Sequence, residues 1–234
     1  MEVARWEDSH RSLVARIAGL LGVAIVVIAL MPGGLGGPLF DNVSTPQILD
    51  WVKHNGASIT RDGFVGGVQA TAVGLIIFVL VVITRGRGLL ATIAAGSGAA
   101  FMAIDWVGAG VYFGLADAGQ RSQADPGIVA LFSLTKEMTF TDGFVFGMAV
   151  IAVSVMALRT RTLPVPLVWL GFVAGGFHIV SLPILIAISG TAGGVTGPIS
   201  VVLALLWILS TSAILLIKPI WGPRQAALNP ATTN

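Results

Sequence analysis

Six long apolar segments, separated by shorter polar connections, dominate this sequence. They cover approximately residues 13–35, 63–84, 89–115, 138–158, 163–188 and 198–217. About 20 apolar residues in a helix cross the roughly 30 Å hydrocarbon core of a bilayer, and each segment reaches that length. Only 10% of the residues are charged and 55% are hydrophobic, whereas about 25% of a typical soluble domain is charged. We therefore predict an all-α, polytopic membrane protein with six transmembrane helices in three hairpins.

A short motif occurs twice and relates the first two hairpins. Residues 62–67 read DGFVGG, and residues 142–147, 80 positions later, read DGFVFG. At the same offset, Pro46 corresponds to Pro126. Because both copies open an apolar segment in the same direction, we predict an internal parallel repeat. We expect the glycines of the motif to allow close helix packing, which is a structural role shared by Gly63, Gly67, Gly143 and Gly147.

The two longest connections, residues 36–61 and 116–137, each contain a helix-start pattern. Thr45-Pro46 and Asp125-Pro126 combine a capping residue with a proline, and Asn55-Gly56 is typical of a helix end. The sequence therefore predicts a short surface helix in each long outer loop. A glycine-rich turn is predicted at residues 190–197.

The distribution of Lys and Arg predicts the orientation of the chain. One side carries nine basic residues and the other carries four, and the richer side is expected to face the cytoplasm. This places both termini in the cytoplasm and the long loops outside the inner (plasma) membrane of a bacterium. We expect a cytoplasmic segment at residues 1–12, a transmembrane domain at 13–217, and a partly disordered cytoplasmic tail at 218–234.

Several classes of function are disfavoured by composition. The chain has no cysteine, which excludes disulfides, thiolate catalysis and Cys-ligated metal sites. A net charge of +2 without a basic stripe gives no indication of a nucleic-acid partner. No phosphate-binding loop, nucleophile elbow or zinc-binding histidine pair occurs. We expect no cofactor and no metal centre, and an enzymatic activity is disfavoured although serine-based hydrolysis stays open.

Ionisable residues at membrane depth are the candidates for a functional site. Asp105 lies 16 residues into the third segment, about 24 Å from its start at 1.5 Å per residue, and His178 reaches a comparable depth in the fifth. Asp62, Asp142 and Glu137 stand at the outer ends of the second and fourth segments. We therefore expect one outward-facing layer of four carboxylates and an imidazole. Asp105, His178, Asp142 and Asp62 are the candidates for binding a ligand or an ion.

Each candidate also has a structural explanation. Asp62 and Asp142 can cap helix starts, where a carboxylate accepts hydrogen bonds from free backbone N–H groups. Asp105 can form a structural polar contact with a neighbouring helix. His178 can be a hydrogen-bonded packing residue, and Glu137 can pair with the lysine that precedes it.

Our leading functional hypothesis is a binding or transport-related module. It would take a small cationic or amphiphilic ligand, or protons, through the outward-facing layer. One alternative is an intramembrane, metal-dependent lipid hydrolase. Another is an accessory or assembly subunit that docks a membrane protein partner. The lipid bilayer is a partner in all three.

The layout resembles a family of bacterial six-span membrane proteins, mostly actinobacterial, whose function is unknown. The matching features are the proline-initiated segment at 45–56, Phe64 and Gly67 at the start of the second span, and the sequence LPVPLVWLG at 163–171. The resemblance covers most of residues 13–217. It implies a six-span fold but no activity and no residue roles.

Overall fold

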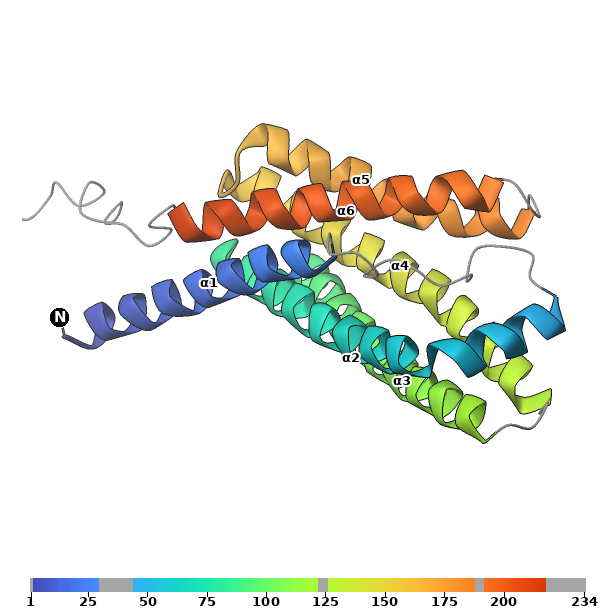
Figure 1. Cartoon of the computed structure of the whole chain (residues 1–234). Coiled ribbons are helices and arrows are strands. Elements are labelled where there is room, and N and C mark those ends of the chain that lie inside the picture. The colour runs from blue at the N-terminus through green and yellow to red at the C-terminus, as the bar shows by residue number, and fades with distance from the viewer. Residues whose placement is uncertain (1, 30–43, 122–125, 188–191, 218–234) are drawn as a thin grey trace, which may run out of the picture.

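The computed structural model describes residues 2–29, 44–121, 126–187 and 192–217. These residues form six α-helices and no strand (Figure 1). The helices are α1 (Glu2–Ala29), α2 (Thr45–Ile83), α3 (Leu89–Gln120), α4 (Pro126–Thr160), α5 (Val165–Ala187) and α6 (Ala192–Ile217).

Three long helices form one half of the bundle. Helix α3 packs between α2 and α4, and these are the most extensive helix contacts in the molecule. Helix α5 packs on α4, α6 packs on α5, and α1 lies along α6 and α2 (Figure 1). Helices α1, α5 and α6 therefore cover one side of the α2–α3–α4 layer.

The helices are apolar enough to indicate a membrane protein. Four of them contain stretches of sufficient length and hydropathy to cross a bilayer, located in Thr45–Ile83, Leu89–Gln120, Thr141–Thr160 and Ile199–Ile217. Shorter apolar stretches occur in α1 (Leu13–Ala29) and α5 (Val165–Val180). The end of the first predicted segment, at residues 30–35, and the predicted tail at 218–234 lie outside the described residues.

The short helix predicted before the second span is the first part of α2, which runs from Thr45 to Ile83 with a break in helical geometry at Asn55. Its N-cap is Ser44 rather than Thr45, and the Ser44 N–H donates to Gln47 Oε1 at 2.9 Å. The expected stop at Asn55-Gly56 is a kink, where Asn55 has φ −119° and ψ 18°. Asn55 Nδ2 donates to Trp51 O at 2.8 Å at this kink, so the predicted break is present and the chain continues directly into the second span.

The second long loop was predicted wrongly. Helix α3 continues to Gln120, and α4 runs from Pro126 to Thr160 without interruption. The glycine-rich turn is shorter than predicted, since α6 already begins at Ala192. Asp62 and Asp142 consequently lie inside helices, and the interpretation of both as N-caps is wrong.

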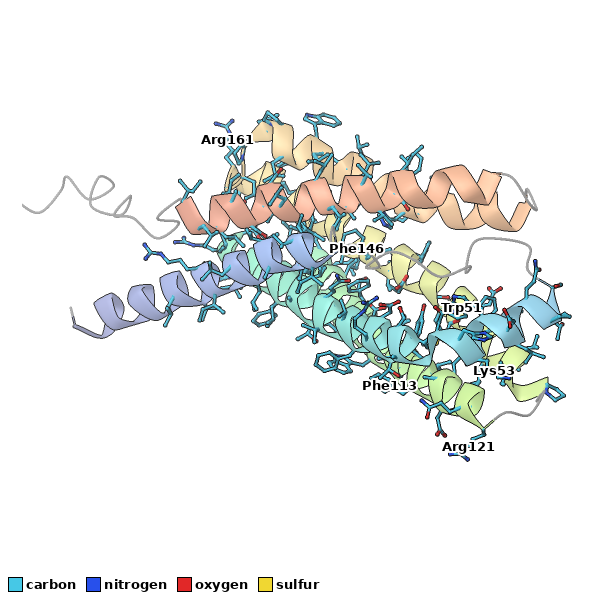
Figure 2. The ribbon with its side chains drawn as sticks, viewed as in Figure 1. Trp51, Lys53, Phe113, Arg121, Phe146 and Arg161 are labelled. Atoms are coloured by element: carbon cyan, nitrogen blue, oxygen red, sulfur yellow. The ribbon has the colours of Figure 1, made fainter. Side chains whose placement is uncertain are left out.

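Tertiary packing explains these extensions. The ends of α2, α3 and α4 bury a small apolar group, here called the cap cluster, which consists of Ile48, Val52, Ile59, Leu115, Ala116, Ile128 and Phe132. It is separate from the main core, which includes residues of all six helices. Burial of this cluster packs the part of α2 before the kink at Asn55 against the ends of α3 and α4. Figure 2 shows Lys53 and Arg121 at this end of the molecule and Arg161 at the other.

Candidate functional site

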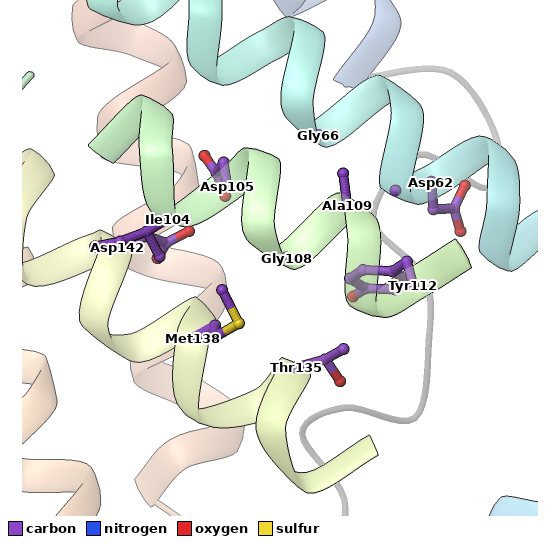
Figure 3. A pocket seen from close by; sticks show the side chains of 11 residues that line it. Asp62, Gly66, Ile104, Asp105, Gly108, Ala109, Tyr112, Thr135, Met138 and Asp142 are labelled. Atoms are coloured by element: carbon purple, nitrogen blue, oxygen red, sulfur yellow. The ribbon is translucent and has the colours of Figure 1, made fainter. Parts of the chain in front are cut away.

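A small cavity lies between α2, α3 and α4, and three carboxylates line it (Figure 3). Its volume is about 50 Å³, which has room for a few water molecules or one small ion. The lining residues come from all three helices and are Asp62, Gly63, Gly66, Ile104, Asp105, Gly108, Ala109, Tyr112, Thr135, Met138 and Asp142.

The cavity separates the two apolar parts of the α2–α3–α4 layer. On α2 it occupies positions 62–66, between Ile59 of the cap cluster and Ala72 of the main core. On α4 it occupies positions 135–142, between Phe132 of the cap cluster and Phe146 of the main core. Along α2 and α4 the cavity therefore lies between the two apolar clusters.

Asp105 and Asp142 form the centre of the site. Both side chains line the cavity, Asp105 from α3 and Asp142 from α4 (Figure 3). Each residue is half-buried and lies near the middle of a long helix, so neither is available to cap a helix end.

Asp62 lies at the other end of the cavity, beside Tyr112 (Figure 3). Its Oδ1 accepts from Arg61 Nε at 3.1 Å and from Arg61 Nη2 at 3.0 Å. Ser58 Oγ donates to the second carboxylate oxygen at 3.4 Å. The carboxylate of Asp62 is thus already paired with a cation, in contrast to the carboxyl pair at the centre.

Two glycines of the repeated motif bring α3 close to α2. A Cβ atom at Gly63 would lie 2.7 Å from Tyr112 Cβ, and one at Gly67 would lie 3.0 Å from the ring of Trp106. The Trp106 indole N–H donates to Thr71 Oγ1 at 2.9 Å and fixes the same contact. These close approaches place the Tyr112 ring against the cavity.

His178 does not line the cavity. Its Nδ1–H donates to Ala174 O at 2.8 Å within α5, and its ring meets Phe146 edge-on at 4.9 Å. The ring lies against Gly143, where a Cβ atom would be 3.4 Å from His178 Cδ2. His178 therefore packs on the face of α4 that contacts α5. Glu137 is exposed and is also not among the lining residues.

Tyr112, Thr135, Gly66 and Met138 line the cavity but were not among the predicted site residues. For Tyr112 a sequence signal exists, since it lies seven residues, or two helical turns, beyond Asp105 on the same face of α3. Thr135 has no such signal, because it lies where a loop was expected. Within the described part of the chain, no group of three His, Cys, Asp or Glu side chains could hold a metal ion.

Comparisons with known proteins add no family to this description. No family model, no curated protein and no solved structure matches the chain. The site must therefore be interpreted from its own geometry.

Proposed function

We propose that this protein is a membrane-embedded module that binds a small cation, or a proton in its place, at Asp105 and Asp142. The observation that supports it is that Asp105 and Asp142 line the same cavity of about 50 Å³. Neither residue takes part in an ion pair among the described residues. Two carboxyl groups without a basic partner, placed between apolar clusters, favour the binding of a positive charge.

The chemistry of the Asp105 and Asp142 carboxyl groups limits the class of ligand that can bind. Carboxylate oxygens are the usual ligands of hard cations, whereas divalent ions require six or more oxygen ligands and tight geometry. Among the described residues, only two of the carboxyl groups that line the cavity lack a basic partner, and the cavity has room for a few waters at most. A monovalent cation with one or two waters fits this site better than an amphiphile or a divalent metal, and a proton competes with it for the same oxygens.

Removal of the central carboxylates tests this proposal. Asp105→Asn and Asp142→Asn keep the shape of each side chain but remove its charge, and each should lower the affinity for sodium or potassium at least tenfold. Asp117→Asn is the matched control, because Asp117 is an exposed aspartate of α3 that pairs with Arg121 outside the cavity. Titration calorimetry of the purified full-length protein with sodium, potassium and calcium chlorides measures the ion affinities of all three variants. Unchanged affinities in both cavity variants would refute the proposal.

The proposed protein crosses the inner membrane six times with both termini in the cytoplasm. The support is that all six helices contain an apolar stretch, four of them of membrane-spanning length, and that one side of the predicted topology has an excess of basic residues. Because the chain has no cysteine, single cysteines can be introduced without a background. Lys53→Cys should react with an impermeant maleimide from outside, and Arg87→Cys should react only after the cells are opened. The reverse pattern would invert the proposed orientation.

The internal repeat is part of the same proposal. Pro46 and Pro126 both stand at the start of their helices, and an aspartate follows each of them after 16 residues. In both copies the motif glycines face the helix that follows. A Cβ atom at Gly63 would meet α3, and one at Gly147 would lie 2.6 Å from Gly175 O on α5. This shared packing supports a duplicated hairpin.

A further inference from the structure

The turns that follow α2 and α4 have the same backbone geometry. Each contains a Thr-Arg pair in which the arginine has a left-handed backbone, with φ 48° at Arg85 and φ 53° at Arg161. In both turns the N–H after the arginine donates to the carbonyl five residues back, at 3.0 Å after Arg85 and at 3.3 Å after Arg161. Glycine is the usual residue at this position of a helix end, because a Cβ atom disfavours the left-handed backbone. Both turns therefore keep an arginine where the backbone favours glycine.

Met156 of α4 brings the two turns together. Its Sδ lies 4.0 Å from Thr84 Oγ1 and would lie 2.6 Å from a Cβ atom at Gly86. Its carbonyl accepts from Thr160 Oγ1 at 2.8 Å. The turns after α2 and α4 thus meet at one residue, at the end of the molecule where Figure 2 labels Arg161. The arginines in and beside these turns are here called the arginine cluster, which consists of Arg85, Arg87, Arg159 and Arg161.

The arginine cluster has no counter-charge in the described part of the chain. All four side chains are exposed, and none of them takes part in an ion pair among the described residues. The sequence has no acidic residue between Asp62 and Asp105 and none after Asp142. The start of α3 adds to the positive potential, since its N-cap Gly88 has no side chain and its first turn contains no acidic residue. This surface therefore favours an anion.

Exposed apolar side chains adjoin the cluster along the chain. Leu89 is 75% exposed and follows Arg87 after one residue, and Leu158 is 44% exposed and directly precedes Arg159. Trp169, near the start of α5, is 60% exposed. A free phosphate would use only the charges of such a surface. A phospholipid presents a phosphate together with acyl chains, so it matches both parts.

We propose that the arginine cluster binds the phosphate group of an anionic phospholipid at the membrane surface. The inference does not depend on the proposed cation site. A guanidinium suits this ligand because it donates two parallel hydrogen bonds to phosphate oxygens. A general excess of basic residues on one side accounts for orientation alone. It does not account for arginines at two positions whose backbone favours glycine, and such strained positions are typical of binding sites.

Removal of the two left-handed arginines tests this proposal. Dihexanoyl phosphatidylglycerol, dihexanoyl phosphatidylcholine and inorganic phosphate are each titrated into the full-length protein in a nonionic detergent, and binding is followed by tryptophan fluorescence. The native protein should bind phosphatidylglycerol at least tenfold more tightly than either other probe. A basic residue near an anionic lipid surface contributes about fivefold in affinity. The double variant R85Q/R161Q should therefore bind phosphatidylglycerol about 25-fold more weakly and phosphatidylcholine as the native protein does.

Two further double variants are the controls. K53Q/R121Q removes two positive charges at the opposite end of the molecule (Figure 2) and should change the affinity for phosphatidylglycerol less than twofold. R85G/R161G removes the same charges as R85Q/R161Q but relieves the left-handed backbone. It should lose phosphatidylglycerol binding to the same extent while unfolding at a higher temperature than the native protein, and it answers the question if R85Q/R161Q does not fold.

Three results would overturn the proposal. Equal affinities of the native protein for phosphatidylglycerol and phosphatidylcholine would show that the surface does not select an anionic lipid. An equal loss of affinity in K53Q/R121Q would show that net charge, rather than the arginine cluster, attracts the lipid. Inorganic phosphate that binds as tightly as phosphatidylglycerol would show that the ligand is a free anion.

Discussion

Two glycines of α2 that lie one turn apart should respond in opposite ways to the same substitution. A Cβ atom at Gly63 would lie 2.7 Å from Tyr112 Cβ and 3.3 Å from Ala109 O, whereas one at Gly66 would have nothing within 4 Å. Neither of the atoms that crowd Gly63 is the far end of a flexible side chain. In Gly63→Ala, α3 itself must move away from α2. In Gly66→Ala, the new methyl group enters the open part of the cavity.

The expected magnitudes follow from two terms. Replacing Gly by Ala inside a helix favours the folded state by about 1 kcal/mol, and this gain applies equally to both positions. Overpacking a tight contact costs about 1–3 kcal/mol, and only Gly63→Ala incurs it. Gly66→Ala should therefore be more stable than the native protein by up to about 1 kcal/mol. The free energies of unfolding of the two variants should differ by about 1–3 kcal/mol, because the propensity term cancels in that difference.

Reversible unfolding in mixed micelles, followed by the fluorescence of the six tryptophans, measures this difference. The two variants have the same composition and the same helix, so each serves as the control for the other. If Gly66→Ala loses as much stability as Gly63→Ala, or if the two differ by less than about 0.5 kcal/mol, the described contact between α2 and α3 is incorrect.

Three further predictions concern the cavity and its surroundings. Gly66→Leu should fill the cavity and abolish cation binding, while Gly96→Leu, at a position of α3 with equally open surroundings, should leave binding unchanged; equal effects would show that Gly66 does not border the site. His178→Phe should lower the free energy of unfolding by about 1 kcal/mol, because the hydrogen bond to Ala174 is lost. It should leave the affinity for sodium within twofold, and a tenfold loss of that affinity would place His178 in the site. Thr211→Val should leave the free energy of unfolding unchanged or raise it by up to about 1 kcal/mol, because the buried Thr211 hydroxyl has no hydrogen-bond partner among the described residues. A clear loss of stability in the unfolding assay would show that this hydroxyl does have a hydrogen-bond partner.

The apolar segments were visible in the sequence, and the ends of the helices were not. Membrane-length hydrophobic runs identify helices without knowledge of their neighbours, which is why the all-helical architecture could be predicted. The ends depend on tertiary contacts. The break predicted at Asn55-Gly56 is present as a kink, but the sequence does not show that Val52 and Ile59 on either side of it are buried in the cap cluster. Only the folded structure shows that this burial is available.

The depth of the candidate site residues along their helices could be predicted from the sequence, but the direction in which each side chain points could not. Counting residues along each helix placed Asp62, Asp105 and Asp142 in one layer, and the structure places all three on one cavity. The same count gave His178 a similar depth but carries no information on the rotation of α5 about its axis. His178 faces Phe146 and Gly143 and is not among the residues that line the cavity.

The separation of the cap cluster from the main core has a consequence for motion. The cap cluster has seven buried residues, from α2, α3 and α4 only, while the main core includes residues from all six helices. Apolar units of such unequal size have unequal local stabilities, and the smaller one opens at lower free energy. Partial unfolding of the three helix ends would therefore uncover the carboxyl pair while the rest of the bundle stays intact. This local unfolding would let an ion exchange with the surroundings without a hinge motion between domains.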